Sequence, residues 1–280
     1  MSSPLSRRRL TSLALLIGLL SSVIAPRAAV AQSGAATKTL RVLFIGNSYT
    51  YFNNLGDIVA GIAAVQKNGP RIVPTLAVHG GITLRWHLEN GPAMSLLESG
   101  GWDYVVLQEH SLLGADTNRQ PPVMGGAANF HESTRELVRR IRAVKAEPIL
   151  FMTWARRDHL EQQKDLANAY IQIGKELGVT VAPVGLAWTE ARRRWLSMDL
   201  HIWDESHPTP YGSYLAGCVL YASLTGMKPE IAAELIEGHP IERTTGVVDF
   251  QTTVPLVDIR PATAKALQEV AWQTVEDLRH

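Results

Sequence analysis

Short apolar runs alternate with helix-like segments along most of the chain. The runs with the length and composition of buried strands are residues 40–45, 72–78, 104–108, 148–153 and 180–184. Apolar residues recur with helical spacing at 55–65, 83–97, 131–144 and 160–177, and again at 261–278. Because strands that alternate with helices form a parallel sheet covered on both faces, the pattern predicts an α/β fold.

Two stretches lack this regular pattern. Residues 112–129 are rich in Gly, Pro, Asn and Asp and predict a long loop after the third strand. A loop of that length in a compact domain is often functional, for example as a lid or a rim that contacts substrate. Residues 230–259 mix short apolar runs with Gly246 and Pro255, and we find no functional signal in them.

The first predicted strand ends abruptly at Gly46-Asn47-Ser48. Ligands of open parallel sheets bind outside the carboxyl ends of the strands, so the Ser48 hydroxyl is well placed for nucleophilic chemistry. The alternative is that Ser48 only caps the helix that begins near Leu55, since Ser is common at such turns.

A second segment, Trp203–Gly212, supplies the groups that a serine nucleophile needs. Asp204 and His207 are three residues apart, so one tight turn lets the carboxylate orient the imidazole that would take the serine proton. Pro208 and Pro210 would stiffen that turn through their fixed φ.

In these segments the sequence resembles the SGNH hydrolases of the GDSL esterase and lipase superfamily. The family's first block, Gly-Asp-Ser, corresponds to Gly46-Asn47-Ser48, and its last, Asp-x-x-His-Pro, to Asp204–Pro208. Gly81, within His79–Thr83, matches the glycine of the second block. In the third block Gln108 stands where the family has Asn, and it can present the same amide group. The blocks occur in the family's order between residues 39 and 226.

This resemblance implies a three-layer α/β/α, flavodoxin-like fold with a five-stranded parallel sheet. It also implies that Ser48 attacks an ester carbonyl, that His207 is the general base and that Asp204 orients His207. The oxyanion would be held by the backbone N–H groups of Ser48 and Gly81 and by the side-chain amide of Gln108. The family's Asp is not the triad acid, so Asn47 can replace it and organise the turn by hydrogen bonding.

The N-terminus has the pattern of a secretory signal peptide. Ser6-Arg7-Arg8-Arg9 precedes the apolar run 10–25, and Ala29-Val30-Ala31 has the form that signal peptidases cut. We therefore predict a signal peptide at 1–31, export to the periplasm or the extracellular space and no stable membrane insertion afterwards. A retained anchor is the alternative, and the paired arginines also suit the twin-arginine route.

The remaining residues, 32–280, have the length of one domain, with a core at 39–226 and an extension at 227–280. With 46% hydrophobic and 19% charged residues and a net charge of +1, the chain has no strong field to bind nucleic acid. Arg192–Arg194 are expected on the solvated face or end of a helix. Cys218, the only cysteine, is expected to be a buried packing residue. Nothing in the sequence fixes the oligomeric state.

Several other side chains are candidates for substrate contacts. Aromatic residues near the blocks, together with Asn47, can contact a sugar or an acyl chain: Tyr49, Trp86 and Trp203. Arg156 and Arg157 could reach an anionic group, although solvent exposure is the ordinary state of such charges. His79, His87 and His110 are expected to be satisfied polar residues. His201, Asp204 and His207 would diverge on a helix, so we predict no metal site and no cofactor.

The sequence therefore predicts an exported serine esterase whose substrate is a small-molecule or glycan ester, in particular an acetylated carbohydrate. A lipase or thioesterase that acts on longer acyl chains, and an acyltransferase, would need the same residues. An exported binding protein with a decayed site is the alternative from a different class.

Overall fold

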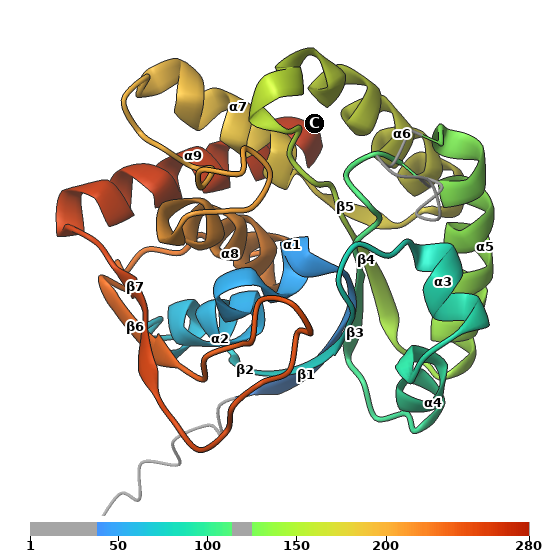
Figure 1. The fold of residues 1–280 in the computed structure, drawn as a ribbon. Coiled ribbons are helices and arrows are strands. Elements are labelled where there is room, and N and C mark those ends of the chain that lie inside the picture. The colour runs from blue at the N-terminus through green and yellow to red at the C-terminus, as the bar shows by residue number, and fades with distance from the viewer. Residues whose placement is uncertain (1–37, 114–124, 280) are drawn as a thin grey trace, which may run out of the picture. The chain divides into compact units, whose positions relative to one another are not determined.

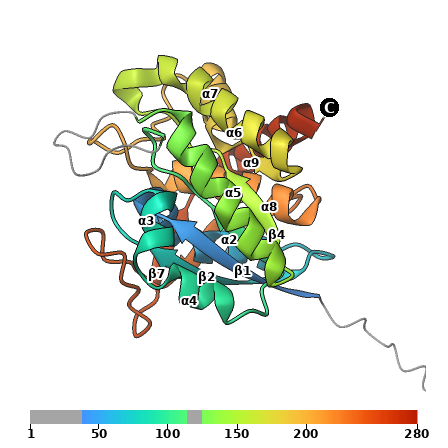
Figure 2. The same ribbon diagram turned by 90° about the vertical axis from the view of Figure 1, so that its right-hand side faces the viewer.

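A five-stranded parallel sheet with the order β2-β1-β3-β4-β5 forms the centre of the fold (Figures 1 and 2). The structure is a computed structural model that describes residues 38–113 and 125–279. The strands are β1 (Thr39–Gly46), β2 (Arg71–Val78), β3 (Tyr104–Leu107), β4 (Glu147–Phe151) and β5 (Thr180–Ala182). The predicted α/β fold is confirmed. Since β2 and β3 pair with opposite edges of β1, the strand order reverses there, and a ligand crevice is expected at the carboxyl end of β1.

Helices cover both faces of the sheet, as Figure 1 shows. One layer contains α2 (Leu55–Ala64), α7 (Val184–Arg194), α8 (Pro210–Thr225) and α9 (Pro261–Arg279). The other contains α3 (Leu84–Glu89), α4 (Ala93–Glu98), α5 (Ala127–Ala143) and α6 (Gln163–Leu177). The short helix α1 (Ser48–Tyr51) and the 3-10 turns Phe52–Asn54 and Arg157–Gln162 follow β1 and β4.

Alternate residues of β1 face two separate hydrophobic clusters. Val42 and Phe44 pack into the cluster with α2 and α8, whereas Leu43 and Ile45 pack into the one with α5 and α6. All four are completely buried. The continuous apolar run in the sequence thus results from the two-residue period of a strand that is covered on both sides.

The single helix predicted at 83–97 is wrong. The structure has α3 and α4 instead, separated at Asn90-Gly91-Pro92. Gly91 adopts φ 77°, and a Cβ atom there would lie 2.8 Å from the Trp86 ring. The apolar residues keep their helical spacing across the break, which is why periodicity alone did not reveal it.

Two expectations about side chains on the outer helices are confirmed. Cys218 lies completely buried in α8, where burial raises the pKa of its thiol. The arginine triplet forms the last turn of α7, and Arg193 and Arg194 both pair with Glu190. Two of the three arginines are thus paired with an acidic residue of their own helix.

An antiparallel hairpin that the sequence did not predict follows α8. Its strands are β6 (Leu235–Gly238) and β7 (Val254–Asp258). Ile236 and Val257 bury their side chains against the helix layer of α2 and α8. The connection at 239–253 turns back toward α1, and the Tyr51 hydroxyl donates a 2.8 Å hydrogen bond to the Arg243 carbonyl. The extension therefore reaches the carboxyl edge of the sheet.

One aspartate of α2 fastens this connection. Asp57 Oδ2 lies 2.9 Å from both the backbone nitrogen and Nδ1 of His239, and it also accepts a 2.9 Å hydrogen bond from Asn54. Asn54 in turn donates to the His239 carbonyl. The two chain segments, which are far apart in sequence, are held by one carboxylate.

Some of the sequence predictions fall on the N-terminal segment and on the loop after β3. The described residues all belong to a compact unit that spans Thr37–His280. The predicted signal peptide at 1–31, and residues 114–124 of the predicted loop, lie outside the described residues. Within 38–113 and 125–279, no helix is both long enough and apolar enough to span a membrane.

We expect Asp57→Ala to lower the free energy of unfolding by about 1–3 kcal/mol, because it leaves the backbone N–H of His239 without its acceptor. Hydrogen exchange should rise between 235 and 258, measured by mass spectrometry. Glu237→Ala, which removes an exposed carboxylate on β6, is the matched control. Equal exchange in both variants would contradict the anchoring role of Asp57.

Candidate active site

Ser48 is the first residue of α1, directly after the end of β1. Asn47 caps this short helix, since its Oδ1 accepts a hydrogen bond from the Tyr49 backbone at 3.1 Å. The next helix, α2, has its own cap in Asn54, so Ser48 is not needed for that purpose. Ser48 is 9% exposed, so it lies just below the protein surface.

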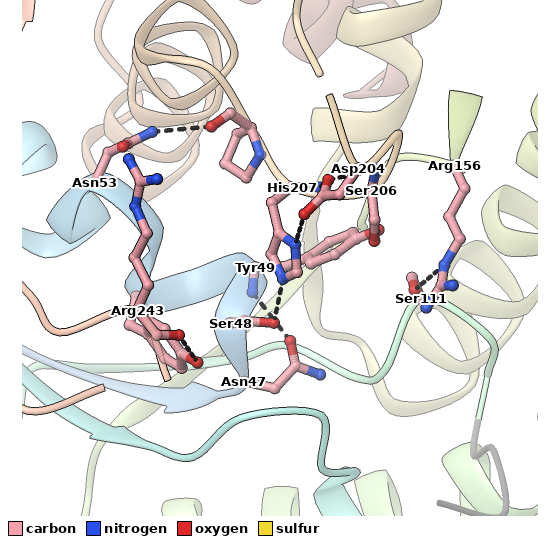
Figure 3. Close-up of polar contacts among 12 residues, drawn as sticks. Asn47, Ser48, Tyr49, Asn53, Ser111, Arg156, Asp204, Ser206, His207 and Arg243 are labelled. Atoms are coloured by element: carbon pink, nitrogen blue, oxygen red, sulfur yellow. Dashed lines mark hydrogen bonds and ion pairs between the residues drawn. The ribbon is translucent and has the colours of Figure 1, made fainter. Parts of the chain in front are cut away.

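Ser48, His207 and Asp204 form one continuous hydrogen-bonded chain (Figure 3). His207 Nε2 lies 2.8 Å from Ser48 Oγ, and His207 Nδ1 lies 2.7 Å from Asp204 Oδ2. Because a carboxylate only accepts, Nδ1 carries the proton and the lone pair of Nε2 faces the serine. The Phe52 ring stacks on the imidazole with ring centroids 4.1 Å apart and limits its rotation.

The loop after α7 holds the acid and the base in this geometry. Asp204 Oδ1 accepts hydrogen bonds from the backbone N–H groups of Ser206, at 3.0 Å, and His207, at 2.9 Å. Glu205 adopts φ 61° at the tip of this turn. Asn53 of the turn after α1 donates a 3.0 Å hydrogen bond to the Pro208 carbonyl, which ties the loop to the serine segment (Figure 3).

The same contacts keep Asp204 ionised. Burial alone would raise the pKa of this carboxyl, but the hydrogen bonds from the backbone of His207 and Ser206 and from the His207 ring lower it below its usual value. A carboxylate at this position stabilises the imidazolium that forms when His207 takes a proton.

A cavity of about 500 Å³ opens over Ser48 and His207. Gly80, Gly81 and Ile82, from the turn after β2, form part of its wall. Within the described part of the chain, the backbone N–H groups of Ser48 and Gly81 have no hydrogen-bond acceptor. Two unused N–H groups beside a nucleophile are suited to hold an oxyanion, and this role stays a prediction for both.

Gln108, for which the sequence predicts an oxyanion role, lies beneath the serine turn, and that role stays a prediction. It is 1% exposed, and its Oε1 accepts hydrogen bonds from the Asn47 N–H at 2.8 Å and the Thr50 hydroxyl at 2.7 Å. Its Nε2 donates to Asn47 Oδ1 at 3.0 Å and to the Glu109 carbonyl. Both amide hydrogens are occupied beneath the serine turn, because the longer side chain of Gln reaches the turn itself.

Gly46 makes this contact sterically feasible. A Cβ atom at this position would lie 2.5 Å from both Gln108 Oε1 and Thr50 Oγ1. No real Cβ approaches a polar atom so closely, so the glycine of the first block leaves room for the amide.

The residues predicted to contact substrate separate into two groups. Asn47 and Tyr49 line the cavity, but Asn47 Nδ2 donates to the Ile82 carbonyl and the Tyr49 hydroxyl lies 2.8 Å from Ser206 Oγ. Trp86 packs against the His79 ring, and it lies outside the cavity lining. Trp203 also lies outside the lining and is 89% exposed beside Asp204. Contacts of these four residues with substrate stay predictions.

The structure adds residues that the sequence did not assign to the site. The side chains lining the cavity also include Tyr51, His110, Ser111, Arg156, Ser206 and Arg243. The sequence already indicates that Arg156 could reach an anionic group. Arg243, in contrast, lies in the extension at 227–280, in which the sequence shows no functional signal. Its place could not be read from sequence because it depends on the hairpin fold.

Three buried histidines near the site act as neutral hydrogen-bonding groups. His87 Nε2 donates to the Gly46 carbonyl at 2.8 Å, and His201 Nε2 donates to the Ala155 carbonyl at 3.1 Å. His110 Nδ1 accepts from the Leu112 N–H at 3.1 Å. Burial is the main cause that lowers the pKa of each ring to about 4.

His201 therefore faces the Ala155 carbonyl and is not part of the chain formed by Asp204 and His207. Throughout the described ranges, no group of three or more His, Cys, Asp or Glu residues is arranged to hold a metal ion. The arrangement at Ser48 has the geometry that a nucleophile, a base and an orienting acid need for acyl transfer, and these roles stay predictions.

We expect Gln108→Ala to lower the free energy of unfolding by about 2 kcal/mol or more, because buried partners in the serine turn lose their hydrogen bonds. Urea unfolding and ester hydrolysis should be measured together. Gln66→Ala, which removes another buried glutamine that bonds the backbone, is the control for stability loss alone. A turnover loss of about a hundredfold with unchanged stability would instead support the oxyanion role.

The buried histidines predict a dependence of stability on pH. Between pH 6.5 and about 4, the unfolded chain binds protons at His87, His110 and His201 that the folded chain does not bind. The free energy of unfolding therefore falls as the pH is lowered through this window, by at most about 1.4 kcal/mol per pH unit for each ring.

Urea unfolding at several pH values measures this slope. His87→Gln should reduce it by about one proton, whereas Gln66→Ala, which changes a buried residue without a titratable group, should leave it as in the wild type. The same slope in His87→Gln and the wild type would contradict the neutral buried state of His87.

Comparison with known proteins gives structural matches only. No family model matches the chain, and no curated protein matches it. A candidate SGNH hydrolase from Slackia heliotrinireducens is 25% identical with a TM-score of 0.52, over 67% of this chain and 100% of the other. A DUF4886 family protein from Bacteroides uniformis is 19% identical with a TM-score of 0.60, over 85% and 95%. A mutant of an acetyl-xylooligosaccharide esterase from Geobacillus Stearmophilus is 16% identical with a TM-score of 0.52, over 69% and 97%.

The last two similarities show a shared fold, and the first, at 25% identity, is to a protein described as a candidate SGNH hydrolase. The five-stranded parallel sheet agrees with the fold that the resemblance implied. By its fold and by the order of its sequence blocks, the chain belongs to the SGNH hydrolase superfamily.

Proposed function

We propose that this protein is a serine esterase that releases small acyl groups, in particular acetyl groups, from carbohydrate esters. The observation that carries this proposal is the continuous chain of hydrogen bonds from Ser48 through His207 to Asp204. In such a chain the serine proton has a base in contact, and the base has a fixed tautomer.

In the proposed mechanism, Ser48 Oγ attacks the ester carbonyl while its proton moves to His207 Nε2. Asp204 stabilises the resulting imidazolium, and the backbone N–H groups of Ser48 and Gly81 bind the oxyanion. The imidazolium then gives its proton to the leaving alcohol, and the C–O bond of the ester breaks. A water molecule, activated by His207, cleaves the acyl-serine and restores the enzyme.

The cavity favours a small acyl group over a long chain. Of the described residues that line it, Ile82 alone has an aliphatic side chain, and most of the others carry polar atoms. A long acyl chain is bound chiefly by burial in an apolar channel, which stabilises the complex by about 0.8 kcal/mol for each buried CH₂ group. This lining offers little apolar surface for such burial. The structural neighbour that acts on acetyl-xylooligosaccharide supports the same substrate class.

Export completes the proposal. The sequence pattern at 1–31 is that of a signal peptide, and an exported esterase would meet acetylated glycans outside the cytoplasm. The exposed ring of Trp203, next to Asp204, is available to stack on a sugar at the rim of the site.

We expect Ser48→Ala and His207→Ala to lower the rate of p-nitrophenyl acetate hydrolysis by about a thousandfold or more, because each removes a member of the triad. Asp204→Asn should cause a smaller but still large loss. Ser95→Ala, on the exposed face of α4, is the matched control and should retain full activity.

A series from acetyl to octanoyl esters tests the acyl preference, and activity that rises with chain length would favour a lipase or thioesterase. Product analysis with an added sugar acceptor would reveal acyl transfer. Should the wild type hydrolyse no ester faster than Ser48→Ala does, the esterase proposal fails and a binding protein becomes the better explanation.

A further inference from the structure

Two arginines line the cavity on opposite sides of Ser48 (Figure 3). Arg156 follows β4, and Arg243 comes from the connection between β6 and β7. We propose that these two guanidinium groups bind a negative charge on the alcohol half of the ester, so that the substrate is an acylated sugar bearing a carboxylate or a sulfate. This inference rests on the proposed esterase function.

Neither guanidinium forms an ion pair with a carboxylate of residues 38–113 or 125–279. Within the described residues, no Asp or Glu oxygen lies within 4.0 Å of the charged nitrogens of Arg156 or Arg243. Arg156 has only a neutral partner there, with its Nε 3.5 Å from Ser111 Oγ. Its neighbour Arg157 differs, because it pairs with Asp199 at 2.7 Å and lines another cavity.

Arg243 is held at the site by neutral contacts. The Tyr51 hydroxyl bonds its backbone carbonyl, and its guanidinium lies over the Phe52 ring, 5.3 Å from the centroid. The adjacent carboxylate of Glu242 accepts hydrogen bonds from the backbone N–H groups of Thr244 and Thr245 and so fixes the turn. No acceptor from the described part of the chain bonds the guanidinium itself, which is therefore available to a ligand.

The position of Arg243 is linked to the catalytic base. The Phe52 ring that lies under the guanidinium also stacks on His207. An anion bound by Arg243 would therefore lie close to His207, and the neutral Phe52 ring would contact both the guanidinium and the imidazole. The positive charge of Arg156, for its part, adds to burial in lowering the pKa of His110 in the cavity wall.

The charge must belong to the alcohol half if the acyl group is acetyl, because an acetyl group has no place for one. A guanidinium offers a planar fork of N–H donors that matches the oxygens of a carboxylate or a sulfate. Arg156 is half-buried, so its interaction with an anion is less screened by water than that of a fully exposed side chain.

The test compares three substrates that carry the same O-acetyl group on the same pyranose ring and differ only at carbon 6. They are the acetylated methyl glucuronide, the acetylated methyl glucoside 6-sulfate and the acetylated neutral methyl glucoside. For the wild type we expect kcat/KM to be about tenfold or more higher for at least one charged ester than for the neutral one. Which charged ester is preferred distinguishes a carboxylate from a sulfate. Added salt should reduce the preference.

Arg156→Gln, Arg243→Gln and the double variant should each lower the ratio of charged to neutral kcat/KM, by about tenfold for each arginine. Arg157→Gln is the matched control and should keep the wild-type ratio. Equal kcat/KM for charged and neutral esters, or a ratio unchanged in the double variant, would overturn the anion site while leaving the esterase intact.

If the wild type hydrolyses none of the esters, the proposed esterase function fails on this sugar, and the anion site is then judged by binding. Calorimetric titration with methyl glucuronide, methyl glucoside 6-sulfate and methyl glucoside would still decide it. Binding of a charged sugar that the double variant loses and Arg157→Gln keeps would support the site. Equal or absent binding of all three sugars would overturn it.

Discussion

The active site depends on a pair of side-chain amides that joins the ends of β1 and β3. Gln108 bonds both the backbone N–H and the Oδ1 of Asn47, and it also accepts from Thr50 in α1. These groups are buried, so each hydrogen bond replaces contacts with water that are no longer available. The turn that carries Ser48 is therefore fixed by the adjacent strand.

This amide pair explains the two departures from the usual SGNH blocks together. Asn47 Oδ1 accepts from Gln108 and from the Tyr49 backbone, while Nδ2 donates to the Ile82 carbonyl. An ionised Asp at this position could not donate to Ile82, and it would place a charge at a buried site. The backbone N–H of Asn47 needs an acceptor and its Oδ1 needs a donor. The side-chain amide of Gln108 provides both, and it is long enough to reach them.

Sequence reasoning predicted the parts of the structure that local patterns determine. The five strands follow from apolar runs, and the proximity of Asp204 to His207 follows from their spacing in one turn. The environment of Gln108 did not follow, since its role depends on the exact distance between two strands. Arg243 was also missed, because the hairpin that carries it is determined by packing on α2 and by the contact between Asp57 and His239.

The commitment of Gln108 to the serine turn has a consequence for the proposed chemistry. Two backbone N–H groups, those of Ser48 and Gly81, are then left to stabilise the oxyanion. They lie on separate turns, and Asn47 connects these turns, since its Oδ1 caps the helix that begins at Ser48 and its Nδ2 bonds Ile82 beside Gly81. One side chain thus sets the spacing of both donors. Electrostatic stabilisation depends on donors that need no rearrangement during the reaction. In the proposed mechanism, the rigidity of this amide cluster therefore serves the oxyanion as the hydrogen bonds from Asp204 and His207 serve the nucleophile.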